Sequence, residues 1–380
     1  MKFALIGTVG VMVFGWSIVA VDMWQCRKRF DVSIPSISIL CLVTARTIYS
    51  MEMSGSTGLP TNGFAFQELA YTACNTMTIL VILTKFLVFT IKRDQFFDLI
   101  KFCYKNFWHG DYDSFGEGVL RDCETRSRTH VFFYTQQNVV PIENMGRNGT
   151  ERVLPFRMYV NFPVYETPYY ESAFALELFA MYHLSMIYFC FDNFLCAINI
   201  HVGGQFRILQ RRLELLSMRL SNTRDLHNVK LKACIIHHQS LIGFMKMVEN
   251  VYTLVALSQV VIFSLLLCLT GSTVIRRFIF VTHSCGTLNQ IFMFTLTCDD
   301  VTQQSQDVVN AAYSAKWYFR ISKHEGRRFC KDLMIVMMRA SRPCSLTAGG
   351  FAPISLETFT TVRTIVTSMS YLTMLRRSDE

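Results

Sequence analysis

Long apolar stretches, separated by basic segments, constrain this chain more than any other feature of its sequence. A helix needs about 20 mostly apolar residues to cross roughly 30 Å of hydrocarbon. Several stretches approach or exceed that length, and Gly349, Gly350 and Pro353 divide the last one. We count its two parts as one discontinuous helix, so seven spans are predicted. They cover residues 34–52, 68–90, 129–142, 172–198, 250–271 and 278–298, followed by the split pair 332–348 and 354–375.

The composition supports a lipid environment. Apolar residues make up 51% and charged residues 17% of the chain, against roughly 25% charged in a typical soluble domain. The 13 cysteines form no CxxC pair or zinc-finger spacing, and the segments assigned below to the outside contain none. Reduced, mostly buried thiols are therefore expected, without a disulfide framework.

Lysine and arginine collect in alternate segments between the predicted spans, which orients the chain by the positive-inside rule. The N-terminus, with Arg27, Lys28 and Arg29, is predicted to be cytoplasmic and the C-terminus extracellular. The one Asn-x-Ser/Thr sequon, at Asn148, lies in a loop assigned to the outside, so we expect it to be glycosylated. The basic segments are 91–128, 199–249 and 299–331, and the poorer ones are 53–67, 143–171 and 272–277.

Two stretches fit this scheme less well. Residues 3–21 are continuously apolar, which suits a signal peptide, an eighth span or an interfacial anchor. The third span, 129–142, has about a dozen residues before Pro141, or roughly 20 Å of helix. It is too short to cross unaided, and we hypothesise that this chain has lost about ten residues of it.

The basic segments also carry amphipathic patterns, which predict helices that continue out of the membrane. Residues 201–216 repeat apolar side chains at steps of three and four, and further helices are expected at 231–252 and 307–319. His237 and His238 are adjacent and point about 100° apart on a helix, unlike the i, i+4 pairs of helical zinc sites, so packing explains them. Packing or contacts between subunits are expected of Tyr313, Trp317 and Tyr318.

Four motifs resemble the insect odorant receptor family. HHQSLIGF precedes span five, NAAYSAKWY follows span six, and LTAGGFAPISLETFTT (346–361) leads into SYLTMLR (370–376). The C-terminal block is the most specific, with a Gly-rich break before a last half-helix. FAPISLETFTT, and DMW near the start, are similar to the moth pheromone-receptor branch. The resemblance covers roughly half of the chain, residues 201–376.

The resemblance implies a function and an assembly. Family members are seven-span subunits that form heterotetramers with an obligate co-receptor, through the cytoplasmic parts of spans four to seven. Their last half-helices surround one cation pore, and odorants bind in the outer half of each subunit. A small volatile apolar ligand, membrane lipids and the plasma membrane of olfactory sensory neurons are therefore expected. No cofactor and no nucleic acid are expected.

The expected organisation has six parts. Two of them serve recognition and conduction directly: an outer odorant pocket among spans two, three, four and six, and a pore-lining half-helix at the end. The parts are an N-terminal membrane-associated segment (1–33), spans one to four (34–198), a cytoplasmic helical anchor region (199–249), spans five and six (250–298), anchor helices with the first half of span seven (299–348), and the hinge with the pore-lining half-helix (349–380).

An odorant pocket needs mainly apolar and aromatic walls with few polar groups. Glu177 and His283 stand out because ionisable groups at membrane depth are usually functional or paired, and they could pair with each other. Interhelical packing is the alternative for every candidate. The candidates are Phe66, Ala73, Met77, Phe133, Tyr134, Glu177, Met181, Leu184, Phe280 and His283.

The last half-helix places Val366, Ser370 and Met374 or Leu375 about one turn apart, on a shared face. The resemblance assigns this face to the pore, with an apolar constriction at 374 or 375, whereas the pattern alone also suits a packing stripe. Glu357 opens the half-helix after the hinge at Gly349, Gly350 and Pro353. Its carboxylate suits an N-terminal cap or the attraction of cations to the pore.

The sequence contains no GxSxG, HExxH, GxxxxGK[ST] or GxGxxG motif, so an enzyme is not expected. A G-protein-coupled receptor would carry Asp-Arg-Tyr after span three and Asn-Pro-x-x-Tyr in span seven, and neither is present. A gustatory-type relative would follow the terminal Tyr motif with Gln-Phe, whereas Tyr371 is followed by LTMLRR. A non-functional variant lacking part of span three remains an alternative.

Overall fold

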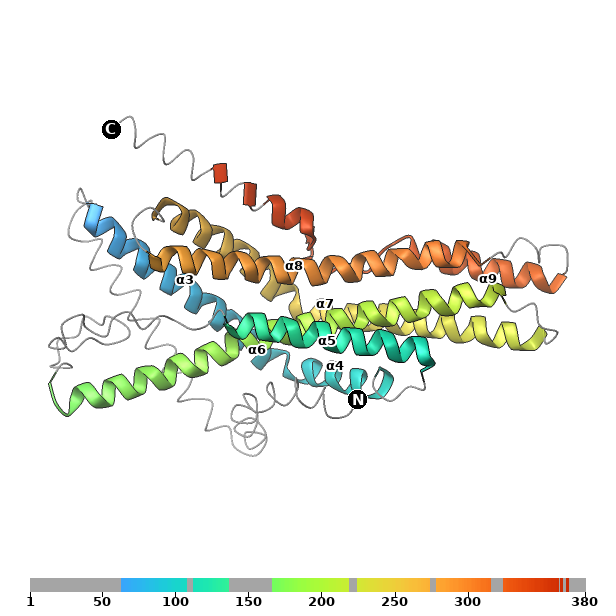
Figure 1. The fold of residues 1–380 in the computed structure, drawn as a ribbon, viewed down its shortest axis with the longest axis horizontal. Coiled ribbons are helices and arrows are strands. Elements are labelled where there is room, and N and C mark those ends of the chain that lie inside the picture. Colours follow the sequence, from blue (N-terminus) through green and yellow to red (C-terminus); the bar gives the residue numbers. More distant parts are fainter. Residues whose placement is uncertain are drawn as a thin grey trace.

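The protein is an elongated bundle whose helices run roughly along one axis (Figure 1). The structure is a computed structural model that describes residues 63–107, 112–136, 166–218, 224–273, 278–315 and 324–361, with the pairs 363–364 and 367–368. Its helices are α3 (Gly63–Ile91), α4 (Arg93–Asn106), α5 (Ser114–Gln136), α6 (Tyr169–Met218), α7 (Arg224–Thr273), α8 (Phe278–Tyr313) and α9 (His324–Ala340).

A short hairpin follows α9. Strands β1 (Thr347–Ala348) and β2 (Ala352–Pro353) pair antiparallel, with Ala348 opposite Ala352. We call residues 346–354 the hinge hairpin. Helical residues 356–361, 363–364 and 367–368 come after it, and we call them the terminal helix. In Figure 1 the terminal helix leaves the bundle beside the middle of α8.

Helices α6 and α7 are too long to lie within a membrane alone. Each has 50 residues, which gives about 75 Å at 1.5 Å per residue, against roughly 30 Å of hydrocarbon. The helices predicted over 201–216 and 231–252 are the end of α6 and a part of α7. The two helices therefore continue from the predicted spans into the basic segment 199–249 without a break. We call the described helical parts of residues 91–128, 199–249 and 299–340 the inner bundle.

The largest core lies in the inner half of the bundle, and the amphipathic pattern in α6 explains its position. Phe206, Leu209, Leu213 and Leu216 form one stripe, and all four side chains are buried. They pack with buried residues of α4, α7, α8 and α9. Burying one such side chain contributes about 1.5–3 kcal/mol, so this stripe fixes α6 at the centre of the bundle.

Helix α5 begins at Ser114, well before residue 129, where the third span is predicted to start, so the helix extends beyond the predicted span. Its first half is charged, and it pairs with neighbours outside the predicted spans. Asp122 accepts a hydrogen bond from Arg207 of α6 at 3.0 Å, and Arg126 lies 3.3 Å from Asp300 of α8. The apolar end of α5 reaches Gln136, and the remaining predicted residues of span three lie outside the described part.

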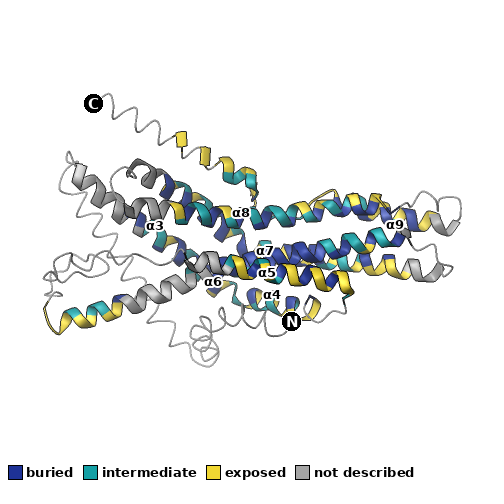
Figure 2. Ribbon diagram, in the orientation of Figure 1, coloured by how far each residue is buried: buried dark blue, intermediate teal, exposed yellow. Residues whose placement is uncertain are grey.

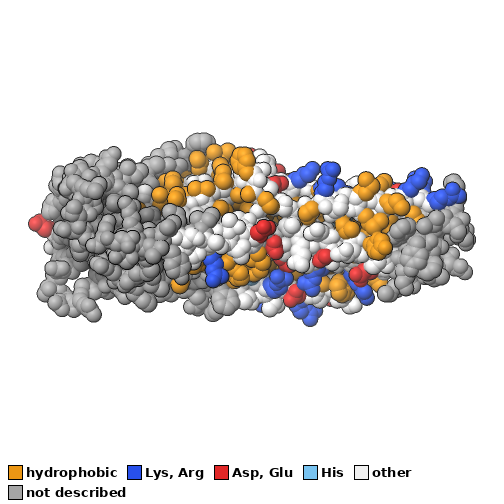
Figure 3. Space-filling model, turned by 90° about the horizontal axis from the view of Figure 1, so that it is seen from above, with side chains coloured by type: hydrophobic (Ala, Val, Ile, Leu, Met, Phe, Trp, Pro, Cys, Tyr) orange, Lys and Arg blue, Asp and Glu red, His pale blue; other side chains and the backbone are white. Residues whose placement is uncertain are grey.

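Exposed apolar side chains mark the face that suits lipid. Leu80 and Leu87 on α3, with Leu254, Val261 and Leu265 on α7, are 46–57% exposed. Buried residues are instead concentrated along the helices in the middle of the bundle (Figure 2). Lys and Arg gather over the half that carries α9 (Figure 3). By length and composition, one segment among the described helices, Val229–Leu267, qualifies to cross a membrane, and Thr76–Ile91 is a shorter apolar segment.

Candidate functional site

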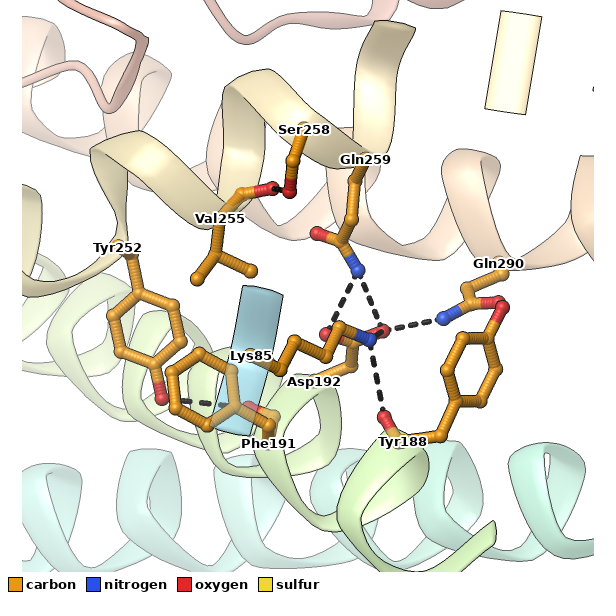
Figure 4. A network of polar contacts seen from close by, with 9 residues as sticks. All are labelled: Lys85, Tyr188, Phe191, Asp192, Tyr252, Val255, Ser258, Gln259 and Gln290. Atoms are coloured by element: carbon orange, nitrogen blue, oxygen red, sulfur yellow. Dashed lines mark hydrogen bonds and ion pairs between the residues drawn. The ribbon is translucent and has the colours of Figure 1, made fainter. Parts of the chain in front are cut away.

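A buried carboxylate joins four helices in the part of the bundle that contains the predicted spans. Asp192 of α6 lies 2.8 Å from the ammonium of Lys85 of α3, and accepts hydrogen bonds at 2.9 Å from Gln259 of α7 at both oxygens. Gln290 of α8 donates to the same carboxylate and accepts from the hydroxyl of Tyr188. Figure 4 shows these side chains converging on Asp192. We call the five residues the polar hub.

The hub satisfies charges that would be costly alone. The Lys85 ammonium also donates to the backbone oxygen of Tyr188 at 3.1 Å and lies 4.2 Å from the centre of its ring. The side chains of Lys85 and Asp192 are 0% and 2% exposed. Removing one partner of such a buried pair costs about 3–5 kcal/mol, because the other charge is left uncompensated. The hub therefore fixes α3, α6, α7 and α8 against one another.

An apolar cluster adjoins the hub and includes one side of the candidate ligand-binding region. Met77, Tyr188 and Leu288 pack against it, and so does Phe359 from the terminal helix. Phe359 also meets Phe292 of α8 edge to face, with ring centres 5.5 Å apart. One candidate ligand-binding residue, Met77, and the terminal helix thus pack against the same cluster. Its buried members are Cys74, Val81, Ile262, Phe263, Leu266, Leu267 and Ile291.

The hinge hairpin is fastened to α7 by three hydrogen bonds. The hydroxyl of Thr347 donates to Glu249 at 2.6 Å, and that of Thr253 donates to the Thr347 backbone oxygen at 3.1 Å. The amide of Gly349 donates to the backbone oxygen of Thr253, also at 3.1 Å. Gly349 and Gly350 have φ angles of 65° and 79°, which L side chains rarely adopt, so glycine suits both positions.

The terminal helix begins with a side-chain cap from Ser355. The hydroxyl of Ser355 accepts from the amide of Thr358 at 3.4 Å, and Thr358 donates its own hydroxyl to the backbone oxygen of Pro353 at 2.9 Å. Glu357 is exposed in the first turn. The hydroxyl cap therefore comes from Ser355, and the carboxylate of Glu357 faces outward near the positive end of the helix dipole.

Two adjacent histidines lie in the inner bundle, His238 buried and His237 half-buried. Burial, together with the nearby Arg339, lowers the pKa of His238 to about 4. Burial also lowers the pKa of His237 to about 4, with added repulsion from Arg212 and His238. The His238 ring meets Phe206 edge to face, and no group of three or more His, Cys, Asp or Glu among the described residues is placed to hold a metal ion.

These features fit what comparison with known proteins finds. A family model described as 7tm Odorant receptor matches residues 65–366, which include α3 from its third residue, helices α4 to α9 and the hinge hairpin. The chain belongs to the seven-transmembrane odorant receptor family. The predicted all-α membrane fold with seven spans is confirmed, and the family is one of receptors rather than enzymes.

Relatives of this odorant receptor come from several insects. It is 24% identical to Odorant receptor 10 of Aedes albopictus over 242 residues, and 25% identical to Odorant receptor Or2 of Anopheles gambiae over 239 residues. Each match covers 60% of this chain. The matched part spans about three fifths of those relatives, 60% and 61% of their respective lengths.

A solved structure has the same fold. The olfactory receptor OR5 of Machilis hrabei, in complex with eugenol, superposes with a TM-score of 0.76 over 92% of this chain and 90% of that one. Another structure of OR5 gives a TM-score of 0.75. The identities are 15% and 14%, so these matches establish the fold alone.

The structure describes only part of the predicted ligand-binding set. Ala73 is buried and Met77 half-buried on α3, and Glu177 is buried on α6. Helices α3, α5, α6 and α8 also contain seven other candidates, whose side chains lie outside the described part. These are Phe66, Phe133, Tyr134, Met181, Leu184, Phe280 and His283.

The predicted pore and anchor residues are described less completely. Tyr313 ends α8 with its side chain 70% exposed. The two glycines, Pro353 and Glu357 lie in the hinge hairpin and at the start of the terminal helix, as described above. The predictions for Asn148, Trp317, Tyr318, Val366, Ser370, Met374 and Leu375 fall outside the described residues.

Sequence reasoning missed the polar hub. A signal was present, because Lys85 and Asp192 are ionisable residues inside predicted spans 68–90 and 172–198, where such groups are usually functional or paired. Their pairing was not readable, since 107 positions separate them along the chain.

Proposed function

We propose that this odorant receptor is the ligand-binding subunit of a ligand-gated, non-selective cation channel. It assembles with an obligate co-receptor as a heterotetramer in the plasma membrane of olfactory sensory neurons. One observation carries the proposal: Met77, from the candidate ligand-binding region, and Phe359, from the terminal helix, pack against the same apolar cluster. A ligand that rearranges this cluster acts directly on the helix assigned to the pore.

The terminal helix is built as a separate element, which supports a gating role. Two glycines with positive φ separate it from α9, and Ser355 caps its start. Helices interrupted in this way are tolerated at membrane depth where protein or water covers the freed backbone groups. By their spacing in the sequence, Val366, Ser370 and Met374 or Leu375 are predicted to share one face, and we propose that a narrow apolar ring there gates by dewetting.

The ligand is proposed to be a small volatile apolar molecule. Long-chain acetates, aldehydes and alcohols follow from the resemblance to the moth pheromone-receptor branch. The flexible side chain of Met77 and the small side chain of Ala73 suit such chains. Phe66, Phe133, Tyr134, Glu177, Met181, Leu184, Phe280 and His283 complete the proposed pocket.

The test is electrical recording from cells that express this chain with an insect co-receptor, challenged with a panel of straight-chain acetates, aldehydes and alcohols. We expect an agonist-evoked cation current that persists when G-protein signalling is blocked. A current lost on blockade would instead support a G-protein-coupled receptor. No current with any ligand, despite surface expression, would support a non-functional variant with a short third span, and sequencing the transcript would then show whether a longer exon exists.

A further inference from the structure

The polar hub joins helices that have different roles in the proposed channel. Lys85, Asp192 and Gln290 belong to α3, α6 and α8, which are spans two, four and six and contribute to the proposed pocket. Gln259 belongs to α7, which contributes no candidate pocket residue. Their relative exposures are 0%, 1%, 4% and 3%, respectively, so all four side chains are buried. Asp192 is therefore the junction between the pocket helices and α7.

Helix α7 connects this junction to the hinge hairpin. Gln259 and Thr253 are six residues apart on one continuous helix, or about 9 Å along its axis. Thr253 exchanges hydrogen bonds with Thr347 and Gly349, and Glu249 accepts from Thr347. An axial shift or rotation of α7 at Gln259 would therefore also move Thr253 and Glu249, and with them the hinge hairpin that precedes the terminal helix.

The hydrogen bonds at Asp192 hold α7 firmly to the pocket helices. In a low-dielectric interior, a polar group that loses its partner pays its full desolvation cost. Separation of α7 from the pocket helices is therefore resisted, so a movement of these helices carries α7 with it. This is the property required of an element that passes a two-state change between sites.

We propose that Asp192, through Gln259, is the positioning residue that couples the ligand-binding helices to the hinge hairpin and so to the pore. The proposal rests on the proposed channel function. Asp192 does not contact the ligand in this scheme. Its contribution lies in the efficacy of bound agonists rather than in their affinity.

The decisive variant is Gln259→Met, which removes both hydrogen bonds from α7 to Asp192 and leaves Lys85 and Gln290 in place. The matched control is Gln210→Met. Gln210 of α6 donates to the backbone and side-chain oxygens of Gln304 at 2.8 and 3.3 Å, in the inner bundle away from the hub. Both variants are expressed with the co-receptor, and currents are recorded for a full and a partial agonist from the straight-chain panel.

The ratio of partial-agonist to full-agonist maximal current is the readout, because it does not depend on the number of channels at the surface. We expect Gln259→Met to lower this ratio about fivefold or more, the lower end of typical coupling between sites. Gln210→Met should leave the ratio unchanged. An unchanged ratio in Gln259→Met, or a shift confined to half-maximal concentrations, would overturn the coupling role.

A second variant covers the case in which Gln259→Met fails to reach the surface. Lys85→Met/Asp192→Leu removes both charges together, and with them the acceptor for Gln259, and so avoids leaving one charge alone. We expect it to reach the surface and to show the same fall in the ratio, whereas a wild-type ratio would overturn the proposal. The wild-type arm tests the channel function separately, since absent wild-type current refutes that function rather than the coupling.

Discussion

The hydroxyl of Thr347 donates a hydrogen bond to a carboxylate oxygen of Glu249 at 2.6 Å, and so ties the hinge hairpin to α7. The two residues are 98 positions apart in the sequence. Because the acceptor is a carboxylate, this bond belongs to the stronger class of hydrogen bonds, worth about 1.5–3 kcal/mol. The hinge hairpin before the terminal helix is therefore held by a hydrogen bond to α7 as well as by its covalent connection to α9.

Thr347→Val should loosen the hinge hairpin locally. Losing about 1.5 kcal/mol raises the population of the opened hairpin roughly tenfold. Hydrogen exchange measured by mass spectrometry on peptides covering 345–355 should accelerate by a similar factor. Thr364→Val, which removes a hydroxyl bonded to Thr360 within the terminal helix, is the control, and equal acceleration in both variants would contradict the role of Glu249.

Gly349→Ala should destabilise the protein more than Gly350→Ala. Both positions have positive φ, so each alanine costs about 1–2 kcal/mol in backbone strain. A Cβ at Gly349 would also lie 2.9 Å from the Cδ2 of Leu257, whereas one at Gly350 would meet nothing within 4 Å. Thermal unfolding in detergent measures the difference, and adding Leu257→Ala should reduce it; equal costs for the two alanines would argue against close packing at Gly349.

Single neutralisation in the polar hub should impair folding more than double neutralisation. Lys85→Met or Asp192→Asn leaves one buried charge alone, at a cost of about 3–5 kcal/mol. Lys85→Met/Asp192→Asn leaves none and should recover much of the yield. Fluorescence-detected size-exclusion chromatography compares the monodisperse fractions, and a double variant no better than the worse single variant would show that the charges do not act as a pair.

Acidification should destabilise the inner bundle through His237 and His238. Their folded pKa values are about 4, against about 6.5 in an unfolded chain. Between these values the unfolded chain binds more protons, so stability is complete above about pH 6.5 and falls as the pH drops toward 4.

The expected loss at pH 5 is about 1–2 kcal/mol for each buried histidine. Melting temperatures of the detergent-solubilised protein at pH 7.5 and 5.0 measure it. His237→Gln/His238→Gln should flatten the dependence, since glutamine does not titrate and Arg212 and Arg339 then face neutral groups. An equally steep dependence in that variant would assign the effect to other residues.

Asn148 should carry a glycan if the predicted orientation is right, since the sequon then faces the secretory lumen. Endoglycosidase treatment should increase the mobility of the wild-type protein and leave Asn148→Gln unchanged. An epitope at the C-terminus should be accessible on intact cells. An accessible N-terminal epitope instead would mean that the orientation is inverted.

Local sequence patterns predicted the helices well. Apolar runs located α3 and the membrane parts of α6, α7 and α8, and a repeat at three and four residues identified the buried stripe of Phe206, Leu209 and Leu213. The break near Gly349 and Gly350 was also readable, because glycine and proline mark backbone that a helix cannot continue. These signals come from residues that are close together in the sequence, within one or two helical turns. The segment predicted over 332–348 was too long at its end, since α9 ends at Ala340 and Thr347–Ala348 form β1.

Relationships between distant residues were not readable in the same way. The pairing of α5 with α6 uses Asp122 and Arg207, and the polar hub depends on Lys85 meeting Asp192. Asp122 and Arg207 are ordinary surface charges, whereas Lys85 or Asp192 would be energetically costly to bury without a partner. In both cases, the packing of the helices decides which partner each residue meets. A single sequence reports which residues need partners, but not which ones they find.

The pairing of Lys85 with Asp192 has an electrical consequence. A lone charge displaced across the bilayer would exchange about 2.3 kcal/mol with the transmembrane potential for every 100 mV. A closely held pair of opposite charges moves no net charge when its helices shift together. In the proposed channel, the hub can therefore take part in opening while contributing almost no gating charge.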